Sequence, residues 1–237
     1  EWDLMNWALG DPEALPTNMI SAGNRFAWDD AGDTPNVMAC AGMSGETPIL
    51  FEVMDLKPGC KPKGGRGVGL VIETENGKFV GGRGGGSFVA NDGAKETFSR
   101  DESAPGDGTR DHMQNFVDAV FAGDRTQLRC DCAVAANSSS MAHMANISFQ
   151  LGRQATASEL NAAFSASDAQ QELITRLQTA TEIYHAKHEG DNDQAWVLGQ
   201  PLEFDNASQE FHGSSAVAAN ERRTREYRNG YSLPEIV

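Results

Sequence analysis

The sequence has few cysteines, few basic residues and no long apolar run, and each shortage excludes a class of protein. Four cysteines in 237 residues are too few and too scattered for the disulfide framework of a small secreted domain. Lys and Arg number 19 against 34 Asp and Glu, so the net charge of -15 argues against a nucleic-acid partner or an anionic membrane surface. No apolar run approaches the roughly 18 to 20 residues of a membrane helix, and no signal peptide is recognisable. The sequence therefore indicates a globular protein and leaves its localisation undetermined.

The first ten residues predict the end of a helix without its beginning. Trp2, Met5 and Leu9 recur at helical spacing, and Gly10 provides a C-terminal stop. No Ser, Thr, Asp or Asn precedes Glu1 as a helix cap. We therefore expect the chain to be the later part of a longer protein, and a short frayed N-terminal turn is the alternative.

The remaining chain predicts strands first and helices afterwards. Between residues 18 and about 98, apolar runs alternate with turn dipeptides such as Asn76-Gly77 and Asp92-Gly93, which favour antiparallel hairpins. From residue 109 the apolar period becomes helical, and it predicts helices over about 109–122, 132–152 and 168–188. The segment 57–67 and the tail after Gly190 are predicted as loops.

Several clusters resemble binding motifs, but their context favours structural explanations. The glycine clusters at 64–69 and 81–86 run into strand-like sequence, whereas a phosphate loop must lead into a helix N-terminus. Turn aspartates, histidines at a helix end and a lone Cys-x-Cys pair lack the spacing of calcium or zinc sites. The residues considered are Asp29, Asp30, Asp33, His185, His188, Cys130 and Cys132. We therefore predict no metal site.

The predicted helix over 132–152 carries a polar stripe. The stripe consists of Ser139, His143, Asn146 and Gln150, at i, i+4, i+7 and i+11. A helix so rich in small and apolar residues is expected to be substantially buried, and its polar side chains then need partners. They either bind interior backbone groups or line a pocket.

Five segments carry a family resemblance. They are EWDLMNWALG, GNRFAWDDAGDTPNVMACAGM, HMQNFVDAV, SSSMAHMANISFQLGR and the tail from LEFDNASQ to SLPEIV. On these segments the chain resembles, along its whole length, the C-terminal domain of the glucose-fructose oxidoreductase, inositol dehydrogenase and MocA superfamily. The likeness is greatest to the long members common in planctomycetes. The most specific features are the H-x-x-N-I helix and the REYR sequence of the tail.

The resemblance implies a two-domain enzyme whose N-terminal Rossmann domain binds NAD or NADP. The C-terminal domain would be α+β, with an open, largely antiparallel sheet and helices packed on one face. Residues 1–237 would form this single substrate-binding and oligomerisation domain, with 1–10 a helix remnant and 190–237 an extended tail. We expect a dinucleotide-binding domain of roughly 150 to 210 residues ahead of Glu1. This chain alone would then bind no cofactor and be inactive.

The resemblance also implies site residues. The usual catalytic histidine would precede Glu1, so no catalytic residue is assigned, and Asp3 matches an aspartate three residues beyond that histidine. His143 and Asn146 match the H-x-x-N-I positions, and Arg25 and Asp30 offer further donors and acceptors for sugar hydroxyls. The implied activity is NAD(P)-dependent oxidation or reduction of a sugar or sugar-like polyol. Ala135 and Ala136 replace the Gly-His pair of some relatives, which leaves the substrate unspecified.

Two other functions fit the same sequence. One is an NAD-dependent glycosidase or sugar lyase that uses the same cofactor domain, and the other is a stand-alone assembly module without catalysis. Consecutive apolar residues in the predicted strands, such as Leu50-Phe51 and Leu70-Val71, point to opposite faces, so both faces are suited to burial. We therefore expect a homo-oligomer formed through the sheet face.

Overall fold

The computed structural model describes residues 2–10, 14–57, 59–60, 68–82, 84–99, 108–188, 194–224, 227–228 and 230–231. The chain divides into two compact units. The first comprises Glu1–Glu13 and Gly64–Met141, and the second comprises Ala14–Lys63 and Ala142–Val237. Among the described helices, none has the length and apolar character needed to cross a membrane.

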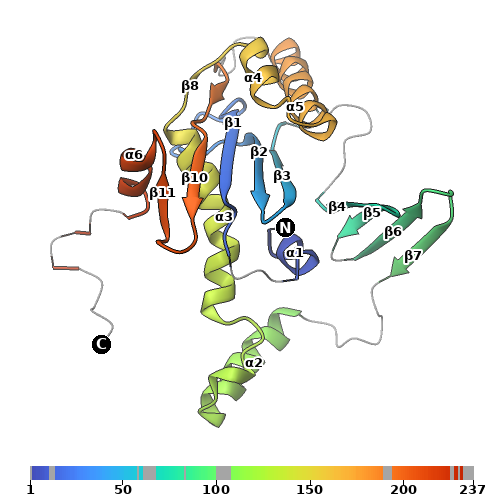
Figure 1. The fold of residues 1–237 in the computed structure, drawn as a ribbon, viewed down its shortest axis with the longest axis vertical. Helices are drawn as coiled ribbons and strands as arrows, with labels where there is room; N and C mark the ends of the chain where they lie inside the picture. Colours follow the sequence, from blue (N-terminus) through green and yellow to red (C-terminus); the bar gives the residue numbers. More distant parts are fainter. Residues whose placement is uncertain are drawn as a thin grey trace. The chain divides into compact units, whose positions relative to one another are not determined.

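The second unit is built on a seven-stranded antiparallel sheet (Figure 1). Its main path runs β11-β10-β1-β2-β3, and the short strands β8 and β9 continue it beside β1. The strands are β1 (Asn18–Asn24), β2 (Val37–Ser44), β3 (Thr47–Met54), β8 (Arg153–Gln154), β9 (Val197–Leu198), β10 (Leu202–Asp205) and β11 (Glu210–His212). A tight hairpin joins β2 to β3, because Gly45 adopts a φ of 58° that residues with a side chain rarely adopt.

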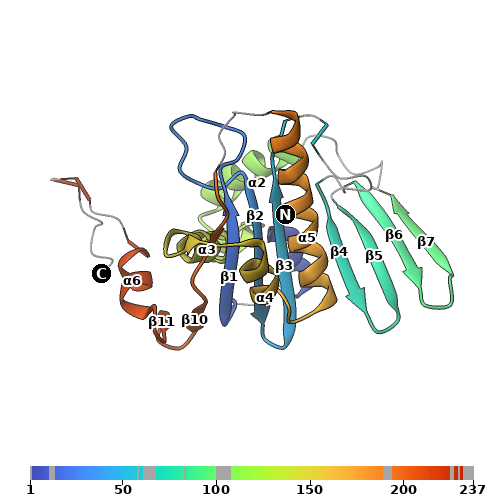
Figure 2. The same cartoon turned by 90° about the horizontal axis from the view of Figure 1, so that it is seen from above.

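Helices cover both faces of this sheet. On one face, α4 (Ala157–Ala163) and α5 (Asp168–Lys187) pack on the strands, and α5 lies along β2 and β3 in Figure 2. Ala22 of β1 belongs to the same apolar core as Leu160 and Leu177 of these helices. Its neighbour Ser21 points to the other face and bonds to α3 (Cys132–Gln150). The sheet therefore has a second helical layer.

The first unit contains a separate four-stranded antiparallel sheet in the order β4-β5-β6-β7 (Figure 2). Its strands are β4 (Leu70–Thr74), β5 (Gly77–Gly82), β6 (Gly85–Ala90) and β7 (Lys95–Ser99). The Phe79 ring covers Gly81 and Gly86, since a Cβ at either glycine would come within 2.6 Å of the Phe79 ring tip. These glycines leave room for an aromatic side chain to lie flat on the sheet.

The helices of the first unit are α1 (Trp2–Ala8), α2 (Gly108–Ala122), the 3₁₀ turn η1 (Arg125–Gln127) and the first part of α3. The helix α2 ends at Gly123, which has a φ of 63°, as the sequence predicts. Its apolar stripe lies on one face, and that face is exposed. The exposed side chains are Met113, Phe116, Val117, Val120 and Phe121.

The α+β class and the antiparallel pairing are confirmed, as are the helices over 109–122, 132–152 and 168–188. Three details of the expectation need correction. The strands form two sheets, and α3 adds a helical layer on the face opposite α5. The prediction that the tail after Gly190 is a loop is wrong, because this segment contains β9, β10, β11 and α6 (Ala216–Glu221). Most of the predicted loop 57–67 lies outside the described residues.

Candidate functional site

The helix α3 carries the polar stripe that the sequence predicts, but the stripe is not buried. Ser139, His143 and Gln150 are exposed, and Asn146 is half-buried. The expectation of a buried histidine is therefore wrong. The physical reason is that α3 turns only its other side to the sheet, where Met144 and its neighbours are buried. Three of the four stripe residues are therefore open to solvent, and Asn146 is only partly so.

A pair of buried serines fixes the position of α3 on the sheet. Ser148 Oγ accepts a hydrogen bond of 3.1 Å from the backbone N–H of Ser21 and donates one of 2.7 Å to the carbonyl of Gln200. Ser21 Oγ donates to the carbonyl of Ala145 at 2.8 Å. Ser148 thus fills the gap between the pairing of β1 with β9 and its pairing with β10. A buried hydroxyl in such a gap satisfies backbone groups that no strand can reach.

The same contacts hold the stripe residue Asn146 in a fixed place. Asn146 follows Ala145 directly, and its Oδ1 atom is shielded from solvent without a hydrogen-bond partner among the described residues. A shielded amide oxygen without a partner costs about 1 to 3 kcal/mol. That cost is removed when a hydroxyl group donates to the oxygen. Asn146 therefore has the chemistry of a binding residue for an alcohol or a sugar, and the ring nitrogens of exposed His143 lie one turn earlier.

Arg25 and Asp30 are brought together, but in a loop of their own. The Arg25 guanidinium forms an ion pair with Asp30 and donates a hydrogen bond of 2.8 Å to the carbonyl of Thr34. Asp30 also accepts from the backbone N–H of Gly32 at 2.8 Å, and a Cβ at Gly32 would come within 2.9 Å of the guanidinium. These contacts close the loop after β1. These three bonds lie within the loop itself and reach neither His143 nor Asn146.

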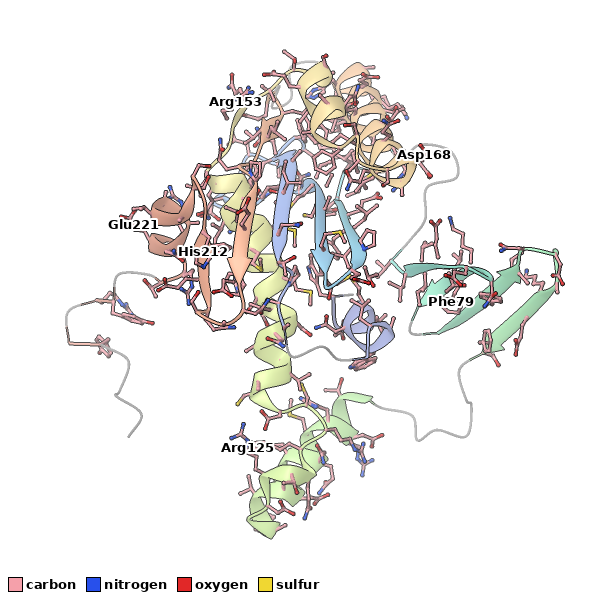
Figure 3. All side chains as sticks on the ribbon, viewed as in Figure 1. Phe79, Arg125, Arg153, Asp168, His212 and Glu221 are labelled. Atoms are coloured by element: carbon pink, nitrogen blue, oxygen red, sulfur yellow. The ribbon has the colours of Figure 1, made fainter. Side chains whose placement is uncertain are left out.

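A hollow of this unit lies beside β10 and β11 and has a volume of about 470 Å³. His212, labelled in Figure 3, lies at its edge with Asp205. Ser208 Oγ and Asp205 Oδ2 both approach the same nitrogen, Nε2 of His212, at 3.2 Å and 3.6 Å. A Ser-His-Asp triad needs the serine and the carboxylate on different nitrogens, so this group is not a triad.

The backbone N–H of Ala207 and the side chain of Ser208 hold the pKa of Asp205 below its usual range. The Asp205 carboxylate therefore stays charged and fixes the turn between β10 and β11 through bonds to the backbone N–H groups of Ala207 and Ser208. Asp205 and Ser208 beside this hollow therefore serve to hold the turn between β10 and β11.

Two of the motifs noted in the sequence, the histidine pair and the second glycine cluster, lie in structural settings. His185 and His188 pack their rings against the buried ring of Tyr184, at centroid distances of 5.5 Å and 5.0 Å. The described glycines of the 81–86 cluster lie in or beside β5 and β6, and those strands lead into no helix. Within the described residues, no group of three or more His, Cys, Asp or Glu side chains could hold a metal ion.

Sequence reasoning did not identify Ser21 and Ser148 as the residues that position the stripe. The signal was present, because Ser148 falls four residues after Met144 and seven after Met141, on the apolar face of the helix. A serine at such a position must bond to something inside the fold. Its partner Ser21 could not be named without knowing which strand lies beside α3.

Comparison with known proteins gives no match: no family, no curated protein and no solved structure corresponds to this chain.

Proposed function

We propose that this chain is the substrate-binding and assembly part of an NAD(P)-dependent oxidoreductase that acts on a sugar or sugar-like polyol. The proposal rests on the family resemblance of its sequence and agrees with its α+β fold and antiparallel sheets. One observation carries it: the shielded, unpaired Oδ1 of Asn146, which lies on α3 between the exposed residues His143 and Gln150. A polyol hydroxyl reaches this oxygen only when the groups that shield it move aside, and by donating to it the hydroxyl removes the cost of leaving it unpaired.

Within this proposal the residues of the chain bind and orient the substrate. Asn146 accepts from one hydroxyl, and His143 accepts from or donates to a second one along the same helix face. The bond network of Ser148 keeps that face in place. The Arg25–Asp30 pair shapes the loop after β1, since the contacts to Thr34 and Gly32 occupy both side chains.

The nicotinamide cofactor, when bound, supplies the acceptor or donor of hydride. The described glycines of this chain do not suit the pyrophosphate of the cofactor. They lie in or beside β5 and β6, and neither strand leads into a helix whose N-terminus could bind a phosphate. We therefore assign cofactor binding to a dinucleotide-binding domain other than this chain.

The assembly role is assigned to the apolar face of the sheet formed by β4 to β7. Its register places apolar side chains on one face, and these include a 6.2 Å ring contact between Phe79 and Phe98. The residues of this face are Leu70, Ile72, Phe79, Phe88 and Phe98. Phe98 is exposed and the other four are half-buried, and we propose that this partly exposed apolar face joins copies in a homo-oligomer.

The assembly proposal is tested by replacing Leu70 or Phe51 with Glu in the native protein. Leu70→Glu should reduce the mass measured by light scattering to that of a smaller assembly. Phe51→Glu applies the same measurement to β3, the edge strand of the other sheet. A native protein that is monomeric at micromolar concentration contradicts the assembly proposal.

The catalytic proposal is tested with the native protein, a panel of polyols, and NAD or NADP. Absorbance of the reduced cofactor should rise with at least one polyol. Asn146→Ala and His143→Ala should lower kcat/KM by about tenfold or more, the effect of one lost hydrogen bond of about 1.4 kcal/mol in the transition state. Ser139→Ala, on the same stripe but bonded to the Ala135 carbonyl of its own helix, is the matched control.

Two alternatives give different outcomes in the same experiments. A glycosidase or lyase of the same superfamily would cleave a glycoside without net cofactor reduction, and product analysis reveals this. A stand-alone assembly module would show no turnover with any glycoside or polyol.

A further inference from the structure

The helix α2, the turn η1 and the start of α3 form a cavity of about 270 Å³ in the first unit. Its lining includes the side chains of two cysteines, Cys130 and Cys132, together with His112 and Phe116. Both cysteines are exposed and unbridged. Two free thiols, on residues separated by Asp131 alone, therefore share a cavity that a small molecule can enter.

A fixed positive charge lies beside one of these thiols. Arg125 Nη2 is 3.6 Å from Cys132 Sγ, and Figure 3 labels Arg125 on this part of the chain. The guanidinium is anchored by two bonds to the Asp131 carboxylate, at 2.6 Å and 2.8 Å. Asp131 also accepts from the backbone N–H of Ala133 at 2.9 Å, at the start of α3. Asp131, the residue directly before α3, thus holds the guanidinium next to the Cys132 sulfur.

The anchoring pair stays charged over the ordinary pH range. The bonds from Arg125 and from the backbone N–H of Ala133 hold the pKa of Asp131 below its usual range. The bond to Asp131 raises the pKa of Arg125. Cys132 is also the first residue of the 19-residue helix α3, whose N-terminal end favours negative charge, and the Asp131 carboxylate already accepts from the Ala133 N–H there. Cys132 therefore lies beside both members of the Arg125–Asp131 ion pair and at the start of a helix, in a polar setting that a small molecule can reach.

We propose that Cys130 and Cys132 form a thiol–disulfide exchange site for a small disulfide of the glutathione type. Cys132 gives its proton to solvent, and its sulfur attacks one sulfur of the small disulfide. The S–S bond breaks, one thiolate leaves and takes up a proton, and a mixed disulfide remains on Cys132. The sulfur of Cys130, having lost its own proton, then attacks the Cys132 sulfur and releases the second small thiol. Two protein thiols are oxidised to one disulfide, and the small disulfide is reduced to two thiols.

The other two cysteines provide internal controls. Cys40 and Cys60 are fully buried, and burial raises the pKa of the Cys40 thiol. Buried thiols of this kind are unreactive. The exchange reaction should therefore consume two of the four thiols in the folded protein.

The test treats the native protein with oxidised glutathione and follows the products by intact mass and by mass analysis of the peptide that contains both cysteines. The expected product has lost two hydrogens and carries a Cys130–Cys132 disulfide. Cys130→Ser should stop the reaction at a glutathione adduct on Cys132. Arg125→Gln should slow adduct formation about two- to fivefold, the range expected for a nearby surface charge, and Arg125→Lys should restore part of the rate.

Arg222→Gln is the matched control, because Arg222 is an exposed arginine of the second unit that donates to a helix carbonyl. It should leave the rate unchanged. The proposal is overturned if Cys130 and Cys132 react no faster in the folded protein than in urea. It is also overturned if Cys132 forms the glutathione adduct equally fast in the native protein and in Arg125→Gln.

Discussion

Replacing Ser148 with Ala should loosen α3 from the seven-stranded sheet. The Ser148 hydroxyl accepts from the buried backbone N–H of Ser21 and donates to the carbonyl of Gln200. Ser148 is fully buried, so water does not take the place of the lost hydroxyl without rearrangement. The substitution therefore removes two hydrogen bonds and leaves the Ser21 amide without a partner.

The magnitude follows from these contacts. Each hydrogen bond contributes about 1 kcal/mol net, and a buried donor left unpaired costs a further 1 kcal/mol or more, at roughly the lower limit for such groups. Alanine recovers about 0.5 kcal/mol through its better helix propensity. The net loss in the free energy of unfolding should be about 2 to 3 kcal/mol.

The assay is urea unfolding combined with amide hydrogen exchange at Ser21. Exchange at this amide should accelerate in Ser148→Ala, because it reports the local contact as well as global unfolding. Ser139→Ala is the control on the same helix, where the hydroxyl is exposed and bonds only to the Ala135 carbonyl. The control should change stability by less than about 0.5 kcal/mol. If Ser148→Ala behaves like Ser139→Ala in both measurements, the proposed anchoring of α3 is incorrect.

Three further predictions concern packing, pH and cofactor. Gly199→Ala should destabilise the second unit by about 1 to 3 kcal/mol in urea unfolding, because its Cβ would lie 2.5 Å from Ser148 Oγ, and an unchanged midpoint contradicts this packing. The Thr156 backbone N–H, Arg153 and the Thr156 hydroxyl lower the pKa of Glu159 from 4.5 to about 2, so its contribution is present above pH 4.5 and is lost as the pH falls towards 2. Glu159→Gln should flatten the thermal midpoint over that window, and a midpoint that still falls as steeply refutes the assignment. Calorimetric titration of this chain with NAD and NADP should detect no saturable micromolar binding, because its described glycine cluster lies in strands.

The local elements could be predicted because their signals are local. Asn76-Gly77 predicted the hairpin between β4 and β5, and Gly123 predicted the end of α2. The apolar stripe of α5 predicted a buried helix face, and Leu177 is fully buried there. Each of these features depends on residues within a few positions of one another.

The arrangement of the elements could not be predicted because its determinants are distant in the sequence. Ser21 and Ser148 are 127 positions apart, so nothing in either neighbourhood reveals that α3 covers the second face of the sheet. The tail after Gly190 was predicted as loop because β9 and β11 are only two and three residues long. Such short strands form only because β1 and β10 are already present as partners.

The candidate site was partly predictable for the same reason. Helical spacing aligned His143 and Asn146 correctly on one face. It could not show that His143 is exposed, or that the Asn146 oxygen is shielded without a partner. Both properties depend on how α3 is rotated on the sheet, and the buried serines determine that rotation.

The central claim is that the α3 face at Asn146 binds a polyol, and nuclear magnetic resonance of the labelled protein tests it most directly. The side-chain amide signals of Asn146 should shift saturably when one polyol of a panel is added, together with signals of His143. Asn146→Ala should weaken that binding, and Ser139→Ala should leave it unchanged. Unshifted α3 signals with every polyol, or equal affinity in Asn146→Ala, would contradict the account.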